Sequence, residues 1–122
     1  YLVDSSVWVA LFLDFDTQHR KAEQIIPRLS GAIYVPYGVV AEVTAVLAYK
    51  HSKALADNFI AYLRDNRDLK IVNHDLLDEM NFYTTIPYRL SFIDATLIFL
   101  SQKLDATLIT LDKQLERIAK KM

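Results

Sequence analysis

The sequence contains no cysteine, and it has only 2 glycines and 3 prolines among its 122 residues. This composition excludes a disulfide-stapled scaffold, a collagenous chain and a disordered tail. Because glycine occurs only at Gly31 and Gly38, the chain has neither a phosphate-cradling glycine loop nor the G-x-S-x-G turn of a serine hydrolase. The composition therefore excludes three classes of chain and two kinds of site.

Long hydrophobic runs are also missing. The longest apolar run spans residues 7–13, about a third of the length that a bilayer span requires, and no basic-then-apolar leader precedes it. We therefore expect no membrane segment and a cytoplasmic location. Hydrophobic residues make up 52% of the chain, which is enough for one sizeable core, so we expect a single domain over residues 1–122.

Positive charge is not in excess, because the formal net charge is −1. Nonspecific nucleic-acid binders usually carry many more Lys and Arg than Asp and Glu. If the protein handles RNA, a bound divalent cation could supply a local positive field. The three histidines, His19, His51 and His74, form no spaced pair, so a zinc site is not expected and each is predicted to lie at the surface or at a helix end.

Short apolar segments alternate with longer segments of helical periodicity. The predicted strands are residues 1–3, 33–35, 69–72 and 107–111. The predicted helices are residues 5–13, 17–29, 36–51, 52–66, 74–85, 91–104 and 112–121. Strands that are apolar on both faces are typical of a parallel sheet covered by helices on each side, so the prediction is an α/β fold whose ligands bind beyond the carboxyl ends of the strands.

Four acidic residues occupy positions where such a fold places a site. Asp4 directly follows the first strand and Asp112 the last, so their carboxylates converge if those strands are near neighbours. Glu42 and Asp94 project from apolar helix faces, and neither has a Lys or Arg three or four residues away. Buried carboxylates that lie together raise one another's pKa, and Mg²⁺ or Mn²⁺, which favour oxygen ligands, resolve this conflict.

Helix capping is an ordinary explanation for three of these acids. Asp4 and Asp112 each precede a helix, and Ser91 with Asp94 fits a capping box. Glu42 lies in mid-helix and has no capping role, although an Arg or Lys from another element could pair with it. Capping and a metal site therefore both remain open for Asp4, Asp94 and Asp112.

Four segments in order resemble the PIN domain, in particular the VapC-type toxins of bacterial and archaeal toxin and antitoxin pairs. They are residues 2–8 (LVDSSVW), 35–36 (VP) with 41–43 (AEV), 90–95 (LSFIDA) and 108–113 (LITLDK). The resemblance covers essentially the whole chain. Two mild departures are Ser5, where the family often has Thr, and the loop at residues 87–89 (PYR).

The resemblance implies a three-layer sandwich with a parallel sheet of four or five strands, and a metal-dependent endoribonuclease. Its cofactor would be Mg²⁺ or Mn²⁺, and the metal-assisted hydrolysis would cut RNA phosphodiester bonds. It further implies a homodimer and a cognate antitoxin that docks over the acidic site. The implied metal-binding and catalytic residues are Asp4, Glu42, Asp94 and Asp112, with Ser6 and Thr110 as supporting hydroxyls.

Three other functions stay open. The first is an RNA-processing PIN nuclease outside a toxin pair. The second is a phosphoryl-accepting receiver domain, although that would need adjacent acids after the first strand and a lysine after the last, where this chain has Ser5 and Asp112. The third is a noncatalytic interaction module whose acids only cap helices.

The remaining basic and aromatic residues give weaker signals. Six cations could line an RNA path: Arg20, Lys50, Lys53, Arg64, Arg89 and Lys113. Six aromatic residues are predicted to lie in the core or on a dimer surface and not to stack on bases: Trp8, Phe12, Tyr34, Tyr37, Tyr49 and Tyr62.

Overall fold

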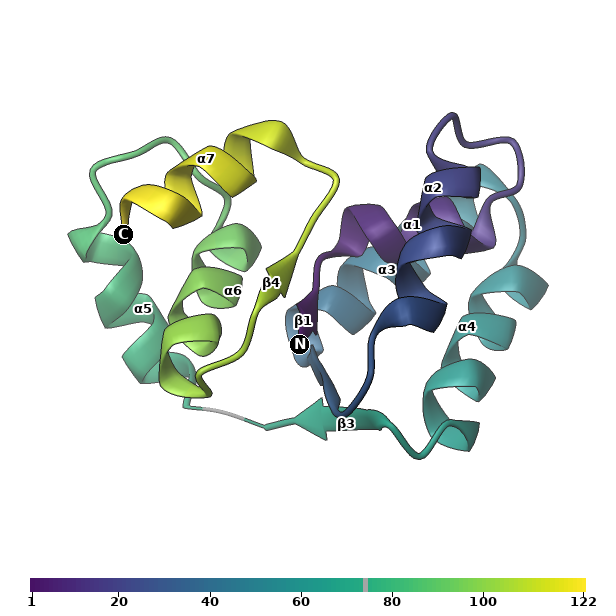
Figure 1. Ribbon diagram of the computed structural model, residues 1–122, viewed down its shortest axis with the longest axis horizontal. Helices are drawn as coiled ribbons and strands as arrows, with labels where there is room; N and C mark the ends of the chain where they lie inside the picture. The colour runs from purple at the N-terminus through teal and green to yellow at the C-terminus, as the bar shows by residue number, and fades with distance from the viewer. Residues whose placement is uncertain (74) are drawn as a thin grey trace.

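A four-stranded parallel sheet runs through the computed structural model, which describes residues 1–73 and 75–122 (Figure 1). The strands are β1 (Leu2–Val3), β2 (Ile33–Pro36), β3 (Leu69–Val72) and β4 (Leu108–Ile109). Their order in the sheet is β3-β2-β1-β4, and every neighbouring pair is parallel. The predicted α/β class and parallel sheet are confirmed.

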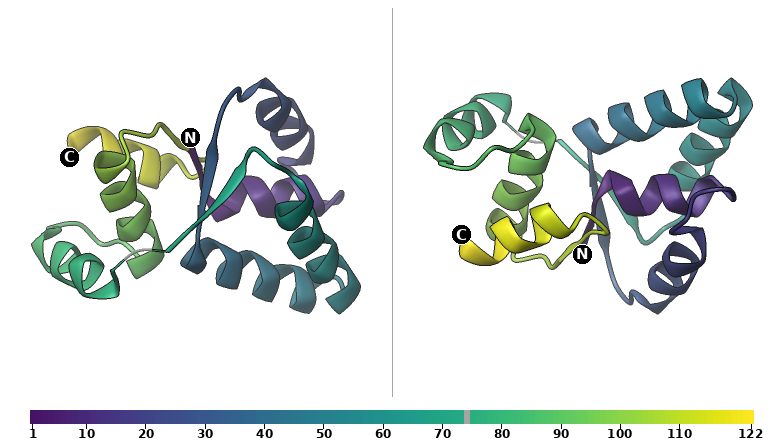
Figure 2. Two further views of the ribbon diagram at one scale, coloured as in Figure 1. Left: turned by 90° about the horizontal axis from the view of Figure 1, so that it is seen from below. Right: turned by 90° about the horizontal axis from the view of Figure 1, so that it is seen from above.

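Helices cover both faces of this sheet. They are α1 (Ser5–Phe12), α2 (His19–Ile25), the 3-10 turn η1 (Ile26–Arg28), α3 (Tyr37–Lys50), α4 (Lys53–Asp65), α5 (Leu76–Thr85), α6 (Phe92–Lys103) and α7 (Lys113–Lys121). Helices α1 to α4 lie on one side and α5 to α7 on the other, which makes the predicted three layers (Figure 2). No helix in the described ranges is both long and apolar enough to cross a membrane.

The predicted helix over residues 17–29 is wrong in one respect, because it divides into α2 and the turn η1. Pro27 has no N–H to donate to an earlier carbonyl and its ring crowds the preceding turn, so the α-helix ends at Ile25. The other predicted helices are present within about two residues of their expected ends. His74 lies outside the described residues, and so do the two predictions made for it, a helix start and a surface position.

Strand β1 lies at the point where the sheet order reverses. Leu2 pairs with Tyr34 of β2 on one side and with Leu108 of β4 on the other. The chain first adds β2 and β3 in one direction and later returns to add β4 beside β1. Because ligands of open α/β sheets bind outside the carboxyl ends of strands at such a switch point, the segments after Val3 and Ile109 are the expected place for a site.

An aromatic cluster joins α1 to α4 beneath this edge of the sheet. Trp8 and Phe59 are fully buried, and their ring centroids lie 5.9 Å apart. Phe12 packs edge-on against Phe59 at 5.4 Å and against Tyr62 at 5.6 Å. The rings anchor α1, the helix that begins directly after Asp4. Of the aromatics predicted to lie in the core or on a dimer surface, Trp8 lies in the core and Phe12 and Tyr62 pack against it, whereas Tyr37 and Tyr49 are 75% and 92% exposed.

Replacing Phe59 with alanine should lower the free energy of unfolding by about 3–5 kcal/mol, because the cavity left between α1 and α4 cannot close fully. Chemical denaturation followed by circular dichroism measures this change. Tyr49→Ala is the matched control, since its exposed ring should alter the same quantity by no more than about 0.5 kcal/mol. Equal effects of the two substitutions would contradict the packing described here.

Candidate active site

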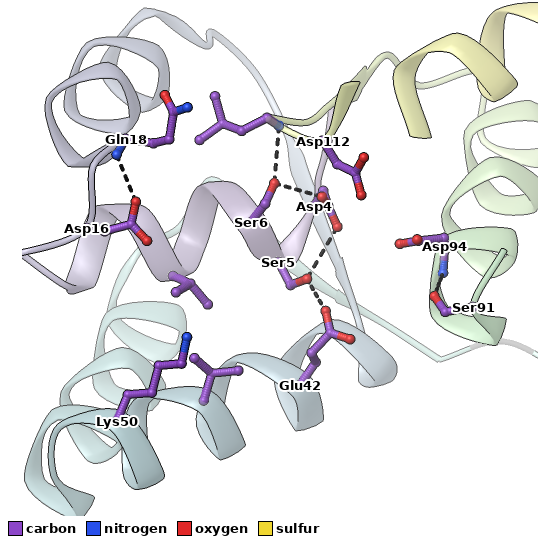
Figure 3. A pocket seen from close by; sticks show the side chains of 13 residues that line it. Asp4, Ser5, Ser6, Asp16, Gln18, Glu42, Lys50, Ser91, Asp94 and Asp112 are labelled. Atoms are coloured by element: carbon purple, nitrogen blue, oxygen red, sulfur yellow. Dashed lines mark hydrogen bonds between the residues drawn. The ribbon is translucent and has the colours of Figure 1, made fainter. Parts of the chain in front are cut away.

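A cavity of about 510 Å³ opens at the carboxyl ends of β1 and β4 (Figure 3). The structure brings all four acids singled out in the sequence to this cavity, from four separate segments: Asp4, Glu42, Asp94 and Asp112. Its other lining residues are Ser5, Ser6, Val9, Asp16, Gln18, Val46, Lys50, Ser91 and Leu111. The cavity therefore carries a strong excess of carboxylates at the switch point of the sheet.

The Asp4 carboxylate is buried, with 3% of the residue exposed, and two hydroxyls hold it in place. Ser6 Oγ and Thr110 Oγ1 both donate to Asp4 Oδ2, at 2.8 Å and 2.7 Å. Each hydroxyl in turn accepts a backbone hydrogen bond, Ser6 from the N–H of Leu111 and Thr110 from the N–H of Asp112. Because these N–H groups occupy acceptor positions on the hydroxyls, both hydroxyl protons are directed to Asp4.

Capping does not explain Asp4. Although this residue stands at the N-cap of α1, its side chain makes no capping hydrogen bond. The carboxylate instead faces the hydroxyls of Ser6 and Thr110, where it also benefits from the positive end of the α1 dipole. Helix capping alone therefore does not account for the position of this buried carboxylate in the cavity.

Helix capping explains the role of Ser91 and part of the role of Asp112. Asp112 Oδ1 accepts from the N–H groups of Gln114 and Leu115 at 2.9 Å and 3.2 Å, which starts α7. Ser91 Oγ accepts from the N–H of Asp94 at 3.1 Å, which starts α6. The carboxylate of Asp94 is thereby placed in the first turn of α6, facing the cavity.

Ser5 makes a contact that sequence reasoning missed. Its hydroxyl donates to Glu42 Oε1 and also lies 3.3 Å from Asp4 Oδ1, so a single proton is shared between two carboxylates. This links the start of α1 to the middle of α3. The sequence analysis assigned Ser5 no role in the site, although its place directly after Asp4 was a usable signal.

The helices that carry Glu42 and Asp94 approach one another from opposite layers. At Gly38, near the start of α3, a Cβ atom would lie only 3.3 Å from Ile93 Cγ1 on α6. The lack of a side chain at Gly38 therefore allows α3 and α6 to come close beside the cavity. Glu42 stands about one turn further along α3, and Asp94 directly follows Ile93.

The four acids act on one another through space. The pKa of Asp94 is raised from 3.8 to about 6, mainly by burial and next by the negative charge of Asp4, with smaller contributions from Asp112 and Glu42. The Ser91 side chain offsets part of this effect. In the described part of the chain, none of the ion pairs involves these four acids. Their mutual repulsion is thus not relieved by a basic side chain there.

The donor chemistry of the cavity suits a hard divalent cation, but the side chains do not form a closed ligand set. Among the described residues, no group of three or more Asp, Glu, His or Cys side chains is arranged so that it could hold a metal ion. Mg²⁺ often uses only one or two carboxylates, with waters and substrate phosphate filling its other positions. The carboxylates and hydroxyls around Asp4 are of this kind, so the residues present fit such an ion.

Two further polar cavity residues were not predicted as part of a site, and Lys50 was predicted only as one of six cations that could line an RNA path. Asp16 and Gln18 lie in the loop between α1 and α2, where Asp16 Oδ1 accepts from the N–H of Gln18 at 2.8 Å. Their local sequence carried no signal for this position. For Lys50 the sequence did carry such a signal, because Lys50 follows Glu42 by eight residues and so lies on nearly the same face of α3.

Replacing Asp94 with asparagine should stabilise the metal-free protein at neutral pH but not in acid. The folded-state pKa of about 6 lies above the unfolded value of 3.8, so the stability that a protonated Asp94 contributes is lost as pH rises through 6. The melting temperature of Asp94→Asn minus that of wild type, measured in EDTA, should therefore grow between about pH 4 and pH 7. Asp14→Asn, at an exposed acid outside the cavity, is the control. A difference that stays constant with pH would contradict the raised pKa.

Comparisons with known proteins agree with this architecture. The crystal structure of Mycobacterium tuberculosis VapC20, described as a sarcin-ricin loop cleaving toxin, is similar, with a TM-score of 0.85 over 95% of this chain and 92% of that one. Sequence identity is 18%, so this similarity concerns the fold. No curated protein matches the chain. A family model described as the PIN domain matches residues 1–121. The protein therefore belongs to the PIN domain family, whose nucleases generally use a divalent metal ion.

Proposed function

We propose that this protein is a metal-dependent endoribonuclease and the toxin of a type II toxin and antitoxin pair. The observation that carries the proposal is the cavity at the β1/β4 switch point, where Asp4, Glu42, Asp94 and Asp112 meet without a basic partner among the described residues. The fold similarity to VapC20, itself an RNA-cleaving toxin, supports the choice of RNA. Because the proposed substrate is RNA, the expected compartment is the cytoplasm.

Asp4, Glu42, Asp94 and Asp112 are the residues that would hold Mg²⁺ or Mn²⁺. When bound, such an ion supplies a Lewis acid for the phosphate and a water of lowered pKa. Ser6 and Thr110 keep the Asp4 carboxylate in one orientation, and Ser5 keeps Glu42 near it. Burial and the repulsion between neighbouring acids together raise the pKa of Asp94, and they are the physical reason to expect a positive charge at this end of the cavity.

Two of the alternative functions agree poorly with the observations. The chain belongs to the PIN family, and it lacks the adjacent acids and the final lysine that a receiver domain would need. A noncatalytic module whose acids only cap helices fits poorly with Asp4, since its carboxylate makes no cap. An RNA-processing PIN nuclease outside a toxin pair would use the same cavity, so growth and antitoxin rescue must separate it from a toxin.

We also propose that the protein forms a homodimer through the α5 surface, defined by Leu76, Leu77, Met80 and Tyr83. These side chains are between 39% and 60% exposed, and Phe92 of α6 is 37% exposed. Leu76 and Phe92 also help to line an apolar hollow of about 240 Å³. Large apolar side chains gathered on one surface are typical of protein interfaces. The antitoxin of the pair is then expected over the acidic cavity.

Purified protein should cut RNA in the presence of Mg²⁺ or Mn²⁺ and not in the presence of EDTA. Its overexpression should slow cell growth unless the cognate antitoxin is produced as well. Asp4→Asn, Glu42→Gln and Asp94→Asn should each lower kcat/KM by about a hundredfold or more, since even the outer partners of metal ligands cost 10–100-fold when lost. Asp14→Asn is the control. Retention of full cleavage by one of the three variants would remove that residue from the site.

Self-association should depend on the α5 surface. Light scattering after size exclusion should give twice the monomer mass for wild type, and one monomer mass for Leu77→Glu, because burying a charge in an apolar interface is costly. Tyr49→Glu changes an even more exposed aromatic side chain on α3 and should leave the dimer intact. A dimer that survives Leu77→Glu, or a monomeric wild type, would rule out this interface.

A further inference from the structure

The acidic cavity has a second end of different chemistry. Beyond Val46 its lining includes Lys50, at the end of α3, and the loop residues Asp16 and Gln18 (Figure 3). Glu42 and Lys50 are eight residues apart on the same helix, which corresponds to about 12 Å along its axis. Lys50 is therefore anchored about two helical turns from Glu42, on the side of the cavity away from Asp94 (Figure 3).

Lys50 differs from the other cations considered for an RNA path. Of those six residues, it alone lines the acidic cavity in the part of the chain that the structure describes. Lys53, only three residues later, instead pairs with Asp57 and borders a separate hollow between α3 and α4. None of the ion pairs of the described residues involves Lys50.

RNA needs such a cation in this cavity, because the protein has a net charge of −1 and the cavity is lined by five carboxylates, Asp16 included. A polyanion gains no attraction from a field of this sign. An ammonium group on a flexible four-carbon stem can reach a backbone phosphate while the helix stays in place.

We propose that Lys50 binds a backbone phosphate of the RNA one or more nucleotides away from the scissile one, and so sets how the strand lies in the cavity. This inference rests on the proposed ribonuclease function. It adds the path of the RNA through the cavity, from the acidic end along α3 to Lys50. An ordinary role also exists for Lys50, since a lysine in the last turn stabilises the helix through its dipole. Substrate binding and salt dependence separate the two roles.

The experiment compares Lys50→Gln with the matched control Lys53→Gln on a labelled single-stranded RNA, both for cleavage with Mn²⁺ and for binding by fluorescence anisotropy in EDTA. Lys50→Gln should raise KM and Kd about tenfold with kcat within about twofold, and should flatten the slope of log Kd against log salt by about 0.7, the value for one phosphate contact on a single strand. Lys50→Arg should restore most of the affinity. Melting temperatures check that each variant is folded.

The possible outcomes distinguish the role of Lys50 from the ribonuclease function. Equal KM and equal salt slopes for the Lys50 and Lys53 variants would overturn the role of Lys50 alone, and so would a fall in kcat with KM unchanged. Binding of RNA that depends on Lys50, without cleavage by any divalent ion, would overturn the ribonuclease proposal and with it the position relative to a scissile phosphate, and would keep only the contact between Lys50 and an RNA phosphate. Wild-type protein that neither binds nor cuts RNA would overturn both.

Discussion

The buried carboxylate of Asp4 is the feature on which the rest of the site depends. Burying a charge costs free energy unless hydrogen bonds replace the lost water, and here Ser6 and Thr110 both donate to one of its oxygens. Those two hydroxyls come from α1 and from the segment after β4, residues that lie more than a hundred positions apart in sequence. One carboxylate therefore ties together the two strand ends that flank the switch point.

The same arrangement concentrates negative charge in a way that stability alone would not favour. Asp94 shows the effect, because burial and the neighbouring acids raise its pKa to about 6. Natural proteins accept such strain mainly at functional sites, where the arrangement serves a ligand. A cation that meets the needs of this cavity would act on stability and on chemistry together, which connects the fold of the protein to its proposed activity.

The proposed RNA binding differs from that of proteins with broad basic surfaces. With 14 basic and 15 acidic side chains, this protein has no excess charge to attract RNA over its whole surface. Attraction must come from a few placed charges: a cation at the acidic end and Lys50 at the other. The apolar α5 surface lies in the helical layer opposite to α3 (Figure 2), and the hollow beside it is also lined by residues at the start of α3, namely Tyr37, Gly38, Val39 and Ala41.

The sequence by itself determined the α/β class, the order of the elements and the four acids, because apolar periodicity and residues directly after strands are local signals. The break at Pro27 was equally local and was overlooked. Only the tertiary structure decided which acids cap helices and which do not, since Asp4 and Asp112 both precede a helix and only Asp112 caps one. Strand order, the bridge from Ser5 to Glu42 and the place of Lys50 depend on contacts between distant segments. Such contacts arise from packing, and no local pattern in the chain encodes them.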